Sequence, residues 1–249
     1  MDNKYKNMKK IKKYLDPSVC KIPKSEDEKH SLVDENLQSS DSMTWRIFRI
    51  MAEFVSGFHF IGQYEKTISF FGSARTEQND RLYHDALELA RRLGKAGFNV
   101  ITGGGPGIME AANQGAQKAC VHSIGLNIQL PYEQRINQYV TKGIGFHYFF
   151  TRKVMLSAAG QAYVYFPGGY GTLDEFFEII TLIQTQKMEP IPVVLYGKDF
   201  WGSLVEYINN IVLKKYGNID ADDAYLFTVV DTVDEAFSIL KKSKPRQDF

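Results

Sequence analysis

A glycine-rich stretch decides the fold that this chain predicts: Pro167-Gly168-Gly169-Tyr170-Gly171-Thr172-Leu173-Asp174-Glu175. It follows a short apolar segment, 162–166, that predicts a buried strand, and it precedes 176–186, where apolar residues recur at helical spacing. Glycine allows the close backbone approach that such a strand-to-helix turn needs. The N–H groups at the start of the helix, together with its dipole, favour a bound phosphate at this turn.

A second turn of the same kind lies upstream. Segment 98–102 predicts a strand, Gly103-Gly104-Gly105-Pro106-Gly107 a loop, and 108–118 a helix. In a parallel sheet both loops leave the carboxyl edge, where open α/β folds bind their ligands. Two phosphate-binding loops at one edge therefore predict a nucleotide-sized site.

The rest of the chain alternates predicted strands with predicted helices. The further strands are expected at 66–71, 121–126, 192–196 and 225–230, and the further helices at 80–96, 146–159, 200–216 and 232–241. This alternation predicts an α/β fold, a doubly wound Rossmann-like parallel sheet with helices on both faces. The stretch 127–145 lacks periodicity, so we expect a long loop there that serves as a lid or base-binding segment.

The N-terminal part differs in composition from the rest. Residues 1–40 are rich in lysine and then mixed polar, which predicts a flexible extension; contact with nucleic acid or anionic lipid is the alternative. Residues 41–66 predict a helical extension capped by Ser42. Its apolar positions are too many for a lone surface helix, so it should pack on the main domain or on a second subunit. Residues 67–249 then form the Rossmann-like domain.

The bulk properties exclude several classes of function. A net charge of +1 over 249 residues argues against a nucleic-acid partner. Cys20 and Cys120 lie far apart, and neither they nor the histidines have the spacing of a metal site, so no metal is expected. No apolar run approaches the roughly 18–20 residues of a membrane span, and no signal peptide is evident. These features favour a cytoplasmic protein without a membrane partner.

Two common phosphate-binding motifs are not met. The dinucleotide fingerprint G-x-G-x-x-G fails because position 108 is isoleucine. Gly94-Lys95 and Gly197-Lys198 are not followed by serine or threonine, so there is no Walker A lysine. Hydride transfer and triphosphate hydrolysis both lose their usual support.

The glycine motifs together resemble the LONELY GUY (LOG) family of phosphoribohydrolases, once widely mislabelled as lysine decarboxylases. The segment 167–175 matches the family's PGGxGTxxE at every fixed position. The segment 103–113, GGGPGIMEAAN, departs from the GGGxxGLMG of the plant-like members and is closer to the longer bacterial members. The similarity covers roughly 67–240.

The resemblance implies hydrolysis of a nucleoside 5′-monophosphate, AMP or a cytokinin riboside 5′-monophosphate, to the free base and ribose 5-phosphate. Breaking the N-glycosidic bond builds positive charge on the ribose. The family motif places its catalytic carboxylate at Glu175, which would stabilise that charge and orient the attacking water. Arg152, within Thr151-Arg152-Lys153, matches the family's second essential residue and would hold the substrate.

The same resemblance implies a set of binding residues and an assembly. The expected substrate-binding residues are Gly72, Ser73, Gly104, Gly105, Gly107, Met155, Gly168, Gly169, Gly171 and Thr172. No cofactor is implied. The family is typically dimeric, so a homodimer or a higher homo-oligomer is expected.

Other interpretations of these residues remain open from the sequence. Thr172 and Glu175 have the spacing of a capping box, in which each side chain satisfies the other's backbone N–H. Arg152 by itself would be a solvated helix arginine. At the level of function, a nucleotide or cofactor carrier without turnover is the alternative. A lysine decarboxylase would need a pyridoxal-phosphate lysine, and the sequence singles none out.

Overall fold

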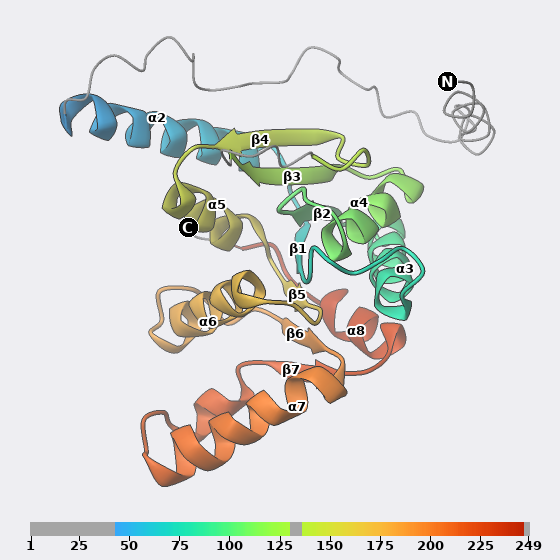
Figure 1. Cartoon of the computed structure of the whole chain (residues 1–249), viewed down its shortest axis with the longest axis vertical. Coiled ribbons are helices and arrows are strands. Elements are labelled where there is room, and N and C mark those ends of the chain that lie inside the picture. The colour runs from blue at the N-terminus through green and yellow to red at the C-terminus, as the bar shows by residue number, and fades with distance from the viewer. Residues whose placement is uncertain (1–42, 130–135, 247–249) are drawn as a thin grey trace, which may run out of the picture.

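The computed structural model describes residues 43–129 and 136–246, and these form one seven-stranded sheet with helices on both faces (Figure 1). The sheet order is β4-β3-β2-β1-β5-β6-β7, and every pair of neighbouring strands is parallel. The strands are β1 (Thr67–Phe71), β2 (Asn99–Thr102), β3 (Ser123–Ile128), β4 (Lys142–Phe146), β5 (Tyr163–Tyr165), β6 (Val193–Tyr196) and β7 (Thr228–Val230). The predicted doubly wound parallel sheet is confirmed.

Two helical layers cover the sheet, and each closes its own hydrophobic cluster. One layer consists of α3 (Arg81–Lys95), α4 (Ile108–Lys118) and α8 (Val233–Leu240). The other consists of α2 (Met43–Ile61), α5 (Phe149–Ala159), α6 (Tyr170–Gln184) and α7 (Lys198–Tyr207). The central strands β1 and β5 are buried along their whole length. A strand buried on both faces reads as a continuous apolar run, which explains why 162–166 was recognisable in the sequence.

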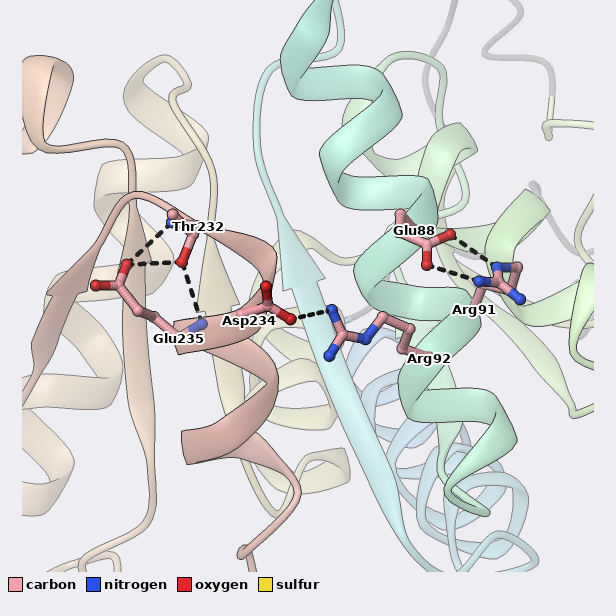
Figure 2. A network of polar contacts seen from close by, with 6 residues as sticks. All are labelled: Glu88, Arg91, Arg92, Thr232, Asp234 and Glu235. Atoms are coloured by element: carbon pink, nitrogen blue, oxygen red, sulfur yellow. Dashed lines mark hydrogen bonds and ion pairs between the residues drawn. The ribbon is translucent and has the colours of Figure 1, made fainter.

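Helices α3 and α8 are joined by polar contacts at the surface of their layer (Figure 2). Arg92 Nη1 lies 2.7 Å from Asp234 Oδ1, and the Arg92 guanidinium also lies over the Phe237 ring. Helix α8 begins with a capping box, in which Thr232 Oγ1 accepts from Glu235 N and Glu235 Oε2 accepts from Thr232 N. The C-terminal helix is therefore anchored at its first turn.

The strand order reverses between β1 and β5. The chain builds outward from β1 through β2, β3 and β4, and then returns to place β5 on the other side of β1. The turns after β1 and β5 therefore diverge at the carboxyl edge and leave a crevice, which is where open α/β sheets bind ligands. The glycine motif at residues 167–175 follows β5 and lies at this switch point.

Strand β4 corrects the expectation of a long loop over 127–145. Lys142–Phe146 pairs with β3 along five residues, and Ile144 and Phe146 are buried. Gly143 and Gly145 hid the strand, because glycine is depleted in strands and leaves no apolar alternation on its face. Residues 130–135 of the expected lid lie outside the described residues, as do 1–40 and Ser42.

Two C-terminal expectations also change. The predicted helix 200–216 is α7 followed by the π-helix η2 (Ile208–Lys215). The predicted strand 225–230 is shorter, because a capping box between Asp220 and Asp223 draws the preceding residues into the 3₁₀ helix η3 (Ala221–Tyr225). Across residues 43–129 and 136–246, no helix is both long and apolar enough to cross a membrane.

Candidate active site

A cavity of about 650 Å³ opens at the switch point of the sheet. Its walls come from the turns after β1, β2 and β5 and from helix α5. The lining includes both predicted catalytic residues, Arg152 and Glu175, and the predicted binding residues Gly72, Ser73, Gly169, Gly171 and Thr172. Residues that are far apart in the sequence thus meet at one edge of the sheet.

The capping-box interpretation of Glu175 is wrong. Helix α6 begins at Tyr170 with Gly169 as N-cap, so Thr172 and Glu175 both lie inside the helix. The early turn is closed by the backbone, since Leu173 N donates to Gly169 O at 3.1 Å. The Glu175 side chain is released from capping and lines the cavity instead.

Glu175 is a buried carboxyl group with little compensation. Glu175 is only 5% exposed, and its Oε2 has no hydrogen-bond partner among the described residues. Burial raises the pKa of Glu175 to about 8, and Lys153 and Arg152 oppose the rise. A carboxyl group with a strongly shifted pKa inside a cavity marks a candidate functional site.

Lys153 lies behind this carboxyl group. Its Nζ pairs with Asp174, lies 2.9 Å from Glu178 Oε2, and lies 4.0 Å from Glu175 Oε1. Desolvation lowers the pKa of Lys153, but the bonds to these acids outweigh it and raise the pKa. No lysine is among the described residues that line the cavity, so this part of the chain offers no amine for a pyridoxal-phosphate aldimine there.

Arg152 is held in the cavity wall and is not a solvated helix arginine. Its Nε donates to Leu126 O at 2.7 Å, and its guanidinium lies 6.0 Å from the centre of the Phe149 ring. A Cβ at Gly103 would lie 2.3 Å from Arg152 Nη2, so a side chain at this position would displace the guanidinium from where it lies. Burial lowers the pKa of Arg152, and the neighbouring Glu175 opposes that shift.

The first glycine loop is braced by the protein itself. Gly104 N donates to Thr102 Oγ1 at 2.9 Å, and the Asn137 side chain donates to the carbonyls of Gly104 and Gly105. Gly107 has φ +70°, and a Cβ there would lie 2.3 Å from the backbone oxygen of Ser73. The structure places Gly104, Gly105 and Gly107 outside the cavity lining, where they hold this loop against the turn after β1.

Two more expected binding residues also lie outside the lining. Met155 is fully buried and faces α2, since a Cβ at Gly57 would meet its sulfur at 2.6 Å. Gly168 packs against Thr172, because a Cβ at Gly168 would lie 2.1 Å from Thr172 Oγ1. Met155 and Gly168 therefore pack behind the residues that line the cavity and do not line it themselves.

Several further lining residues were not among the residues predicted to bind the substrate. Arg75 ends the turn after β1, where its N–H donates to Ser73 Oγ, and its side chain reaches the cavity mouth. Tyr170 is 93% exposed and lines the same mouth, as does Phe149 from α5. The sequence signal for Arg75 is its place at the end of the turn Gly72-Ser73-Ala74-Arg75, which follows the first strand. Nothing local singled out Phe149.

Comparison with known proteins identifies the family of the chain. A family model described as "Possible lysine decarboxylase" matches residues 109–240, which is more than half of the 249 residues. The chain belongs to this family, the LOG family. The match spans Arg152, the second glycine motif and Glu175.

The curated relatives of this LOG chain include plant enzymes. It is 28% identical over 193 residues to a probable cytokinin riboside 5′-monophosphate phosphoribohydrolase of Oryza sativa subsp. japonica, covering 75% of this chain and 88% of that protein. It is 26% identical over 193 residues to a cytokinin riboside 5′-monophosphate phosphoribohydrolase of Arabidopsis thaliana, covering 75% of this chain and 87% of that protein.

Solved structures share the LOG fold. A molybdenum cofactor carrier protein of Chlamydomonas reinhardtii aligns with a TM-score of 0.55 and 24% identity, covering 72% of this chain and 98% of that chain. A molybdenum cofactor binding protein of the phototrophic bacterium Rippkaea orientalis aligns with a TM-score of 0.54 and 21% identity, covering 72% and 96%. At this identity the likeness establishes the fold alone.

Proposed function

We propose that this LOG chain hydrolyses the N-glycosidic bond of a nucleoside 5′-monophosphate, AMP or a cytokinin riboside 5′-monophosphate, giving the free base and ribose 5-phosphate. The observation that carries the proposal is the buried carboxyl group of Glu175, which lines the switch-point cavity and whose Oε2 has no hydrogen-bond partner among the described residues. The activity for which the plant relatives are named supports the same reaction.

The turn after β5 is proposed to hold the phosphate. Helix α6 begins at Tyr170, so its first N–H groups and the positive end of its dipole lie at the cavity. A Cβ at Gly169 or Gly171 would meet nothing within 4 Å, so the protein's own packing does not require glycine there. Glycine instead keeps this helix end bare and lets an anion approach the backbone closely. Arg75 would add a cation at the cavity mouth.

Arg152 and Glu175 are proposed as the catalytic pair. Cleavage leaves positive charge on the ribose, and the ionised form of Glu175 would stabilise that charge and orient the water. Because its surroundings exclude water, the electrostatic effect of one carboxylate is larger here than in bulk solvent. Arg152, fixed by Leu126 O, would hold the substrate and assist the departing base.

Incubation with AMP tests the proposal, with adenine and ribose 5-phosphate separated by chromatography. The expected result is equal release of both products from AMP, with a panel of GMP, CMP and a cytokinin riboside monophosphate setting the base preference. Adenosine should be a far poorer substrate, because it lacks the phosphate whose binding energy the turn supplies. If AMP binds and no adenine appears, the chain is a nucleotide carrier and the proposed reaction is wrong.

Homodimerisation is part of the proposal. Helix α2 exposes an apolar stripe at four-residue spacing: Met43, Ile47, Met51 and Val55 are each at least half exposed. Phe149 and Phe150 of α5 are also exposed. Apolar surface of this extent marks an interaction face. Light scattering at micromolar concentration should give about twice the 28.4 kDa of the monomer. A cytosolic location is proposed with it.

A further inference from the structure

A carboxylate of the N-terminal helix α2 caps a helix of the active site. Glu53 is 2% exposed. Its carboxylate accepts from the backbone N–H of His147 at 2.7 Å, from that of Tyr148 at 3.3 Å, and from the Thr151 hydroxyl at 2.5 Å. Tyr148 is the N-cap of α5 and makes no side-chain cap of its own. A negative charge at a helix N-terminus is favourable, and here it comes from a distant part of the chain.

Helix α5 carries the two cations that face Glu175. Thr151 contacts Glu53, and the next two residues are Arg152 and Lys153. A shift of the first turn of α5 would therefore move both cations together. We infer that Glu53 is a positioning residue, which fixes the start of α5 so that Arg152 lies correctly in the cavity. This inference rests on the proposed function.

A second contact one turn further along fixes the same register. Gly57 lies four residues after Glu53, and Met155 lies four residues after Thr151. A Cβ at Gly57 would be only 2.6 Å from the Met155 sulfur, so glycine lets the two helices approach closely. Two contacts at matching spacing oppose both sliding and rotation of α5 against α2. The Glu53 carboxylate makes the polar contact of the two, and Gly57 against Met155 makes the apolar one.

The chain offers a matched control in Glu235. Its carboxylate also accepts from two backbone N–H groups, those of Asp231 and Thr232, and from the Thr232 hydroxyl. It caps α8, which contributes nothing to the cavity lining. Glu53→Gln and Glu235→Gln therefore remove the same things from a helix cap, the negative charge and one acceptor oxygen, near the site in one case and away from it in the other.

The first experiment compares kcat/KM for AMP and the melting temperature in these two variants. Glu53→Gln should lower kcat/KM about ten- to a hundredfold, because displacement of a binding side chain by about 1 Å costs up to about 10²-fold. Glu235→Gln should keep the parental kcat/KM. In an Arg152→Lys background, Glu53→Gln should cost much less than in the parent, since residues that act through one another are not additive. Equal losses in both backgrounds would overturn the inference.

The second experiment needs no turnover and so separates this inference from the proposed reaction. Carbon-13 NMR follows the titration of Glu175, whose pKa is raised by burial, a rise that Lys153 and Arg152 oppose. Glu53→Gln should raise that pKa by about half a unit or more as the cations move away. Thr151→Val, which replaces the hydroxyl with a methyl group and leaves the Glu53 carboxylate in place, should shift it in the same direction by less. An unchanged titration in a folded Glu53→Gln protein would show that the cap is merely structural.

Discussion

Two four-residue segments of this chain are nearly identical and do opposite things. Thr172-Leu173-Asp174-Glu175 and Thr232-Val233-Asp234-Glu235 differ only in leucine against valine. In the second segment Glu235 caps α8 at the surface (Figure 2), and hydrogen bonds from the Asp231 backbone, the Thr232 hydroxyl and the Thr232 backbone lower its pKa. In the first segment Glu175 is buried in helix α6, and desolvation raises its pKa to about 8.

The residues before each segment cause the difference. Strand β7 ends at Val230, only two residues before α8 starts at Val233, and Thr232 is the N-cap of α8. Before Thr172, the Gly-Gly-Tyr-Gly run lets α6 start at Tyr170, so the same pattern falls inside the helix. A capping-box pattern therefore caps a helix only where the helix begins at that pattern. The four residues of the pattern do not determine where the helix begins. The comparison leads to four predictions.

The largest difference is expected in turnover. Glu175→Gln should lower AMP hydrolysis at least a hundredfold, since losing one electrostatic contact to a developing charge costs about 10²–10³ in rate, or roughly 3–4 kcal/mol. Glu235→Gln should leave the rate unchanged. Initial rates of adenine release on folded protein measure both. A Glu175→Gln protein that works at the parental rate would refute the catalytic role.

The pH dependence of kcat/KM should separate the two carboxyl groups next. If the ionised form of Glu175 is active, kcat/KM should rise about tenfold per pH unit and level off near pH 8, where this group titrates. Glu235→Gln should not change this pH profile. Hydrogen bonds lower the pKa of Glu235, so the group stays ionised over the pH range in which Glu175 titrates. A profile that falls above pH 8 would instead make protonated Glu175 the acid for the leaving base.

Stability should respond to pH in opposite directions. The folded pKa of Glu175 is above its unfolded value of 4.5, so its ionisation costs stability as pH rises from about 4.5 to 8. Glu175→Gln should therefore gain stability relative to the parent over this range, by up to about 1.4 kcal/mol per pH unit. Glu235→Gln should lose stability at neutral pH, and the loss should vanish in acid. Urea unfolding at pH 4, 6 and 8 tests both signs.

The smallest effect concerns the two threonines. Thr232→Ala removes the acceptor for Glu235 N and should lower the free energy of unfolding by about 1 kcal/mol without changing turnover. Thr172 caps nothing and lines the cavity, so Thr172→Ala should instead raise the KM for AMP. Urea unfolding of both variants measures the change in the free energy of unfolding, and steady-state kinetics measures the change in KM. If Thr172→Ala lowered the free energy of unfolding as Thr232→Ala is expected to, Thr172 would act as a cap, which would contradict a helix that starts at Tyr170.

Much of the site could be predicted because its parts carry local signals. The helix at 108–118 follows a glycine loop, and the observed α4 has those same bounds. The β4 strand could not be found, because Gly143 and Gly145 give no alternation and its pairing with β3 is non-local. The bracing of Gly104 by Asn137 was equally hidden, since 33 residues separate the two along the chain.

By itself the sequence determined the parallel α/β fold, the two strand-to-helix glycine turns and the family, because each depends on short-range pattern. Only the tertiary structure decided that Glu175 is buried and uncapped, that Arg152 is seated on Gly103 and bonded to Leu126 O, and that Glu53 caps α5. The physical reason is that pKa and orientation depend on which distant groups exclude water or supply charge. Those groups come together only when the strands are assembled in their order.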